Sequence, residues 1–141
     1  YTVHPGASCV IAETRDGKFV LEKQYRYPIH QVTIEIPAGK KEPNEDPIVT
    51  AKRELEEETG YLAEEFVFLG TMKPAAAYSD EVVNIYYAKV DNGGTIAFDD
   101  TEDLESFLVY FKDFERMILD CEIDDAKTVI AFYLYNSKIR K

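Results

Sequence analysis

The sequence has few cysteines, few histidines and no long apolar run, and each shortage excludes a class of protein. The two cysteines, Cys9 and Cys121, have no spacing typical of a zinc or redox site, so reduced thiols in a cytoplasmic protein are expected. No apolar run approaches the length of a membrane span, and no N-terminal stretch has the features of a signal peptide. Neither histidine, His4 or His30, has an assigned role and no nucleophile is paired with a base, so a covalent Ser-His or Cys-His mechanism has no support.

Basic residues are also scarce. Asp and Glu number 27 against 16 Lys and Arg, which gives a net charge of −11. Binding to the backbone of a nucleic acid requires basic patches, so we expect no nucleic-acid partner. A small anionic substrate is compatible with this charge only where metal ions and a few arginines screen the site locally.

What is present suits one globular domain. The chain has 141 residues, 45% of them hydrophobic, with 10 tyrosines and 8 phenylalanines, which is enough for a proper core. We therefore treat residues 1–141 as a single domain. Because the chain begins at Tyr1 rather than methionine, the prediction allows for a missing segment before it.

Residue patterns predict an alternation of strands and helices. Alternating β-branched and aromatic residues favour strands at 7–14, 19–25, 33–36, 65–73 and 81–90. Two amphipathic helices are expected near 113–120 and 124–138, and the inner face of the second would carry Ala126, Val129, Ile130, Tyr133 and Leu134. Strands with helices on both faces predict an α/β/α sandwich.

A further short helix carries the most informative pattern. Asp46 can cap its start, Pro47 suits the first helical position, and Gly60 offers a left-handed residue to end it. The apolar stripe that would pack on the core consists of Ile48, Ala51 and Leu55.

Three carboxylates border that stripe, those of Glu54, Glu57 and Glu58, whereas Glu56 points away to water. Carboxylates held together at the edge of a core repel each other unless a cation joins them, and hard oxygen ligands of this kind favour Mg²⁺ or Mn²⁺. The alternative is that the glutamates form an ordinary solvated helix face.

The spacing over residues 39–61 favours the cation site. Gly39, then Glu45, then Arg53-Glu54-Leu55-Glu56-Glu57-Glu58-Thr59-Gly60-Tyr61 resembles the Nudix box of the Nudix hydrolases. Outside the box, the chain is similar to the ADP-ribose pyrophosphatase branch of that family at residues 24–26, 35–39, 79–81 and 123–128. The resemblance implies a Nudix-type α/β/α sandwich with a mixed β-sheet and the Nudix loop-helix-loop.

The resemblance also implies roles for individual residues. Glu54 and Glu58 would bind the metal with the Ala38 carbonyl, and Glu57 would be a further ligand or orient water. Arg53 would hold the glutamates by ion pairing, with Gly39 and Gly60 as structural support. The catalytic base would come from an acidic loop, Glu102 first and Asp100 next, with Glu57 as another candidate. Arg26 and Glu81 fall at substrate-contacting positions, although Arg26 alone is equally typical of a solvated strand end.

Glu35 has two interpretations. It would either hold Arg53 or a backbone N–H, which we favour, or line the substrate cleft.

The predicted function is Mg²⁺-dependent hydrolysis of the diphosphate bond of a nucleoside diphosphate derivative. ADP-ribose, cleaved to AMP and ribose 5-phosphate, is the first candidate substrate. Two alternatives stay open: a Nudix hydrolase of another nucleotide sugar or dinucleotide, and a nucleotide-sensing module without turnover. Members of the branch usually carry an N-terminal segment that helps to build a homodimer, and this sequence has little of it.

Overall fold

A mixed β-sheet forms the centre of the computed structural model, which describes residues 1–92 and 104–140. β1 (Ala7–Thr14) pairs in parallel with β7 (Val83–Asn92), and the other strand pairs are antiparallel. The remaining strands are β2 (Lys18–Arg26), β3 (Gln31–Glu35), β4 (Ala38–Lys40), β5 (Tyr61–Leu62), β6 (Phe66–Met72) and β8 (Leu104–Tyr110). The helices are α1 (Pro47–Thr59), α2 (Phe111–Leu119) and α3 (Ala126–Lys138), with a 3-10 turn at Tyr27–Ile29.

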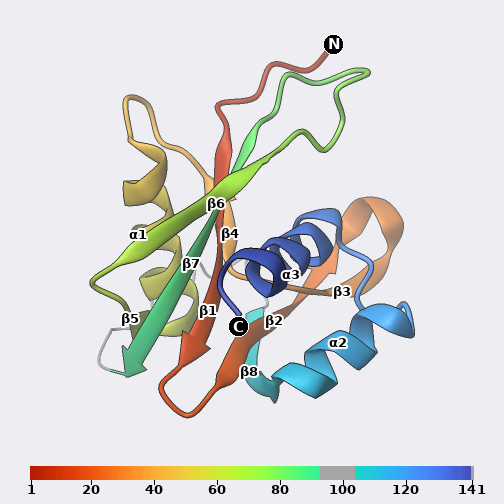
Figure 1. Cartoon of the computed structure of the whole chain (residues 1–141). Coiled ribbons are helices and arrows are strands. Elements are labelled where there is room, and N and C mark those ends of the chain that lie inside the picture. Colours follow the sequence, from red (N-terminus) through yellow and green to blue (C-terminus); the bar gives the residue numbers. More distant parts are fainter. Residues whose placement is uncertain (93–103, 141) are drawn as a thin grey trace.

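Helices cover both faces of the sheet (Figure 1). Successive side chains of a strand point to opposite faces, and β1 is buried on both. Cys9 and Ile11 pack with residues of α2 and α3, whereas Val10 and Ala12 pack with Ala51 and other residues on the α1 side. The predicted α/β/α sandwich with a mixed sheet is confirmed.

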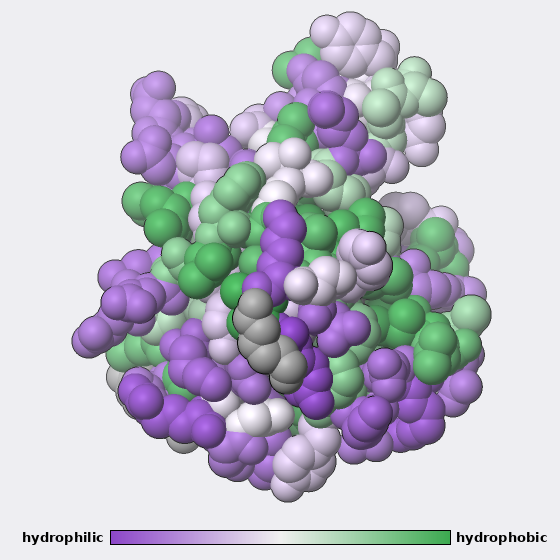
Figure 2. Space-filling model, in the orientation of Figure 1, coloured by the Kyte–Doolittle hydropathy of each residue, from purple (hydrophilic) through white to green (hydrophobic). Residues whose placement is uncertain are grey.

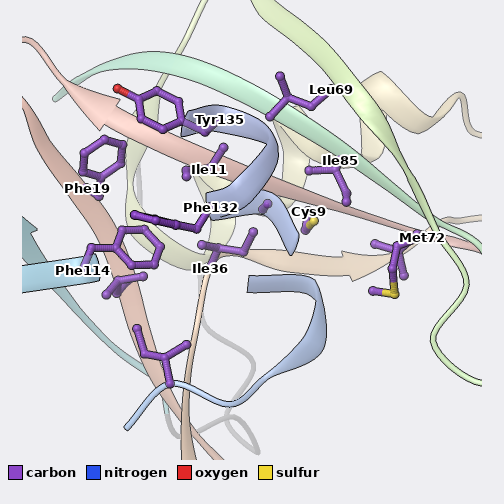
Figure 3. Packing of buried hydrophobic residues seen from close by; sticks show 14 of the residues in the cluster. Cys9, Ile11, Phe19, Ile36, Leu69, Met72, Ile85, Phe114, Phe132 and Tyr135 are labelled. Atoms are coloured by element: carbon purple, nitrogen blue, oxygen red, sulfur yellow. The ribbon is translucent and has the colours of Figure 1, made fainter. Parts of the chain in front are cut away.

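Aromatic rings fill the core under α2 and α3 (Figure 3). The ring of Phe19 lies 5.7 Å from that of Phe114 and 5.1 Å from that of Tyr135, both edge to face. Phe132 lies 4.8 Å from Phe114. Such pairs add about 0.5–1.5 kcal/mol each beyond their buried area, so they fix the C-terminal helices against β2.

The predicted inner face of α3 is wrong in part. Tyr133 is 66% exposed, and the buried residues are instead Thr128, Ala131, Phe132 and Tyr135. The hydroxyl of Thr128 accepts a hydrogen bond from the Ile36 N–H at 3.0 Å, which sets the rotation of the helix. Ala126 is also exposed, while Val129, Ile130 and Leu134 are partly buried against the core.

The apolar stripe of α1 needs a similar correction. Ala51 and Leu55 are buried as predicted, but Ile48 is 44% exposed and Thr50 is buried in its place. The Thr50 hydroxyl donates to Glu45 at 2.6 Å, so its polar group has a partner although the residue is buried. Asp46 is the N-cap by position, yet its side chain makes no capping hydrogen bond.

Tertiary pairing creates strands that local patterns did not predict. No strand was predicted between residues 36 and 65, but Ala38–Lys40 forms β4 and pairs with the first residues of β1. The predicted acidic loop with Glu102 and Asp100 lies outside the described residues.

In the described part of the chain, no helix combines the length and the apolarity needed to cross a bilayer. Hydrophilic and hydrophobic residues form alternating patches over the face that carries α3 (Figure 2).

Candidate active site

α1 presents its glutamates from a helix with well-defined ends. Pro47 occupies the first turn, and Gly60 ends the helix with φ of 75°. At Gly60 the backbone N–H donates to the Glu56 carbonyl at 2.9 Å, so the predicted glycine stop is confirmed. The helix thus holds Glu54, Glu57 and Glu58 within little more than one turn.

Arg53 binds the loop before α1 to the glutamates on it. Its guanidinium donates to both oxygens of Glu45, at 3.0 and 2.9 Å, and to Glu54 at 2.8 Å. Two longer contacts reach Glu57 at 3.5 Å and the Lys40 carbonyl at 3.2 Å. The Arg53 guanidinium, followed by the Thr50 hydroxyl, lowers the pKa of Glu45 to about 2. These contacts match the supporting position predicted for Arg53.

Gly39 allows the carboxylate of Glu54 to lie against the backbone of β4. A methyl group at Gly39 would be 2.1 Å from Cδ of Glu54, well inside van der Waals contact. Glycine leaves the space in which that carboxylate lies, and a Cβ at this position would force the Glu54 side chain to shift. The neighbouring Ala38 N–H donates to Glu58 at 3.3 Å, so β4 contacts two of the three box glutamates.

Glu58 is buried next to a second carboxylate that the sequence analysis missed. Glu58 is 7% exposed and Glu22, on β2, is 1% exposed. Burial raises the pKa of each group, and a side-chain hydrogen bond joins the two carboxyls, which requires a proton between them. The second oxygen of Glu22 has no hydrogen-bond partner among the described residues.

A strand pattern could have located Glu22. Val20 packs in the core under α1, and residues 22, 24 and 26 follow it on the same face of β2. Gln24 and Arg26 line the cleft described below. Glu22 lies between Val20 in the core and Gln24 at the cleft. Strand alternation therefore predicts that its carboxylate points toward α1.

Arg26 lies at the cleft in a bidentate ion pair with Glu35. Its Nε and a terminal nitrogen donate to the two Glu35 oxygens at 2.8 and 2.7 Å. Lys127, at the start of α3, donates to the same carboxylate at 2.6 Å and to Asp125 at 3.0 Å. Burial alone would raise the pKa of Glu35, but Arg26, Lys127 and the Thr33 hydroxyl outweigh it and lower the pKa to about 2.

The expected partner of Glu35 was therefore wrong, because Glu35 pairs with Arg26 and Lys127 rather than with Arg53 or a backbone N–H. Lys127 had no predicted role, since it lies 92 residues from Glu35 in the sequence.

These groups surround one cleft with a volume of about 590 Å³. Its lining includes Arg26, Ala38, Gly39, Arg53, Glu54, Glu58, Glu81 and Lys127. The side chain of Glu57 is 46% exposed and does not line the cleft, staying at its edge beside Arg53. Glu81 also borders a second cavity of about 490 Å³ that Tyr1 and Tyr78 line.

The donor set of the cleft suits a hard divalent cation. As the side chains stand, the described residues include no group of three or more His, Cys, Asp or Glu arranged to hold an ion together. However, Glu54 has a glycine-lined space, Glu58 is buried against another carboxyl, and one buried Glu22 oxygen has no partner. Crowded, buried carboxylates are stabilised by a cation, so these residues fit Mg²⁺ or Mn²⁺.

Two candidate bases and one cysteine are not among the described residues that line this cleft. Glu102 and Asp100 lie outside the described residues. Cys9 is fully buried and desolvation raises its pKa to about 12, which leaves it protonated and unsuited to act as a nucleophile.

Comparison with known proteins decides the family. The family model for the NUDIX domain matches residues 2–132. The chain belongs to the Nudix family. The predicted Nudix pyrophosphohydrolase class is confirmed by this match and by the relatives below.

The Nudix relatives include proteins that match most of the chain. A protein from Bacillus methanolicus named methanol dehydrogenase activator is 41% identical over 91% of this chain and 70% of its own length. An ADP-ribose pyrophosphatase from Bacillus subtilis is 38% identical over the same shares. A crystal structure named ADP compounds hydrolase shares the Nudix fold with a TM-score of 0.81 and 22% identity, covering 98% of this chain and 77% of that one.

Proposed function

We propose that this Nudix chain hydrolyses the diphosphate bond of a nucleoside diphosphate derivative, with ADP-ribose as the first substrate and AMP and ribose 5-phosphate as products. The observation that carries the proposal is the cleft in which Glu54 and Glu58 face Arg26, Lys127 and Glu81. A divalent cation, Mg²⁺ before Mn²⁺, supplies neutralisation of the diphosphate oxygens when bound.

The acidic and the basic side chains of the cleft would have different roles. Glu54 and Glu58, with the Ala38 carbonyl, would hold the cation, and Glu57 would be a further ligand or orient the attacking water. Arg53 keeps Glu45, Glu54 and Glu57 in position through the contacts given above. Arg26 would bind a phosphate group, because a guanidinium matches phosphate oxygens in a bidentate manner. Glu81 would contact another part of the substrate.

A carboxylate must take the proton from the attacking water. Glu102 is the first candidate from the family resemblance, followed by Asp100 and Glu57. We also propose a cytoplasmic protein, for which the unbridged Cys9 and Cys121 are suited. A homodimer stays a prediction from the resemblance.

The names of the relatives support a class of nucleotide-derivative substrates rather than one particular substrate. ADP-ribose pyrophosphatases occur in Bacillus subtilis and Mycobacterium tuberculosis, the second 36% identical over 60% of this chain and 42% of its own length. A hydrolase of a CMP phosphonate from Streptomyces rubellomurinus is 34% identical over 60% of this chain and 41% of its own length. Another nucleotide sugar or dinucleotide is therefore the second candidate substrate.

The Bacillus methanolicus relative, named an activator, favours a second candidate function, a nucleotide-binding regulator without turnover. An assay of product release with Mg²⁺ across ADP-ribose, nucleotide sugars, dinucleotides and nucleoside triphosphates separates the candidates. We expect turnover of ADP-ribose, whereas no product from any compound would favour the regulator.

Two variants test the proposed role of the box glutamates. Glu57→Gln and Glu58→Gln should each lower turnover at least roughly a hundredfold while the fold is kept, as circular dichroism would report. Glu56→Gln, in the same helix, is the matched control and should stay close to wild type. Wild-type turnover in both test variants would contradict the proposed mechanism.

A further inference from the structure

Glu22 is a buried carboxylate whose position no part of the fold explains. Its side chain is 1% exposed and one oxygen has no hydrogen-bond partner among the described residues. An unsatisfied buried carboxylate is costly, and such a group in a folded protein indicates a role in catalysis or an ion that belongs beside it. A core residue at this position of β2 would ordinarily be apolar, as Val20 and Leu21 are.

The strand directs Glu22 toward the box helix. Val20, two residues earlier, packs in the core under α1, so Glu22 points to the same face of the sheet. There its carboxyl is hydrogen-bonded to that of Glu58. Arg26, four residues later on this face, lines the cleft itself. Glu22 therefore lies behind Glu58, on the sheet side of the cleft.

The basic residues near this pair of carboxyls make their hydrogen bonds with other carboxylates. Arg26 is engaged by Glu35 in a bidentate pair, and Lys127 is shared between Glu35 and Asp125. These two cations and two carboxylates balance one another in charge. Lys127 and Arg26 attract Glu22 through space, but among the described residues no basic side chain donates a hydrogen bond to Glu22 or Glu58.

We propose that Glu22 belongs to the cation site as its fourth carboxylate, supplied by the sheet rather than by the box helix. The inference rests on the proposed function, because it concerns the same divalent cation. Glu22 adds negative charge behind Glu58. A cation bound there would compensate the cost of burying its partnerless oxygen. Removing that charge should weaken cation binding even though the Nudix box stays intact.

Mn²⁺ binding to the full chain tests this without any substrate. Free Mn²⁺ is measured by electron paramagnetic resonance during titration of wild type, Glu22→Gln and Glu56→Gln. Gln keeps the shape of Glu22 and can hydrogen-bond Glu58, but it lacks the charge. We expect Glu22→Gln to bind Mn²⁺ about tenfold or more weakly. Glu56→Gln removes the same charge from α1 outside the proposed ligand set and should bind within about twofold of wild type.

Thermal unfolding supplies an independent readout. Without metal, Glu22→Gln should unfold at the same or a higher temperature than wild type, since a costly buried group is gone. With Mn²⁺, its melting temperature should rise less than that of wild type, because the gain follows affinity. Glu22→Met serves as a second uncharged variant of similar volume, and it should show the same weak binding if Glu22→Gln does not fold.

The outcomes separate this inference from the proposed function. Wild-type Mn²⁺ affinity in a folded Glu22→Gln or Glu22→Met variant overturns the role of Glu22 but leaves the hydrolase untouched. If neither Glu22→Gln nor Glu22→Met folds, Glu22 has a structural role and the inference is overturned as well. Absence of Mn²⁺ binding by the wild type would overturn the cation site as a whole.

Discussion

Gly39 and Glu54 approach so closely that a methyl group on the first would lie 2.1 Å from Cδ of the second. Gly39 belongs to β4 and Glu54 to α1, so the end of the Glu54 side chain lies against the strand. The same approach brings Glu54 to the cleft beside Glu58. The glycine of the Nudix box is thus explained by the space its neighbour occupies.

Gly39→Ala should displace Glu54 and lower both stability and turnover. Overpacking of a close contact costs about 1–3 kcal/mol, and the shifted carboxylate would leave the cleft. We expect turnover to fall at least about tenfold, measured beside thermal unfolding. Thr71→Ala, an exposed position in β6, is the control and should change neither. Normal turnover in Gly39→Ala would mean that Glu54 can move without consequence.

Arg53→Lys should destabilise the protein although the charge is kept. Lysine cannot reproduce the forked contacts to Glu45 and Glu54, and partly buried carboxylates would be left without donors. A loss of about 1–3 kcal/mol in the free energy of unfolding is expected from urea titration.

Arg15→Lys is the matched control for Arg53→Lys. Arg15 also contacts a carboxylate, Asp91, with two nitrogens, but the two side chains are 74% and 54% exposed. Exposed pairs contribute about 0–1 kcal/mol, so this substitution should cost little. Equal losses in the two variants would contradict the supporting role of Arg53.

The Glu35 network predicts a pH-dependent contribution to stability. The pKa of Glu35 is lowered to about 2 in the folded protein, below the value of about 4.3 expected when unfolded. The stabilisation is therefore present above the unfolded pKa and is lost as pH falls toward about 2.

Glu35→Gln measures this contribution. The difference in unfolding free energy between wild type and variant should be about 2–4 kcal/mol near pH 7 and should shrink steadily below pH 5. Glu115→Gln, on the exposed side of α2, should show a small difference at every pH. A Glu35→Gln difference that does not change with pH would contradict the predicted pKa.

Arg26→Ala should weaken substrate binding and also lower stability, because buried Glu35 loses its bidentate partner. Arg26 lines the cleft and keeps 43% of its side chain exposed, while Lys127 still pairs with Glu35. We expect KM to rise at least about tenfold with a smaller change in kcat, from steady-state kinetics with ADP-ribose. Lys23→Ala, an exposed position on the other face of β2, is the control. A KM equal to that of wild type would remove Arg26 from the substrate site.

The sequence correctly predicted those strands and helices whose ends are set by residues within or next to them. Residues 7–14 form a strand as expected. α1 begins at Pro47 and ends at Thr59, before the C-cap Gly60, because proline and glycine restrict or permit backbone angles locally. The position of Arg53 among glutamates also followed from helix and box spacing. The acidic loop with Glu102 and Asp100 stays a prediction, since it lies outside the described residues.

By itself the sequence determined the family, the glutamate-rich helix and the strand-helix order, because spacing along one chain carries these features. Only the tertiary structure decided that Glu22 meets Glu58 and that Glu35 binds Lys127 across 92 residues. It also decided which face of α3 is buried, through the bond from Ile36 to Thr128. Contacts between distant segments depend on how strands and helices pack, and no local periodicity records that packing.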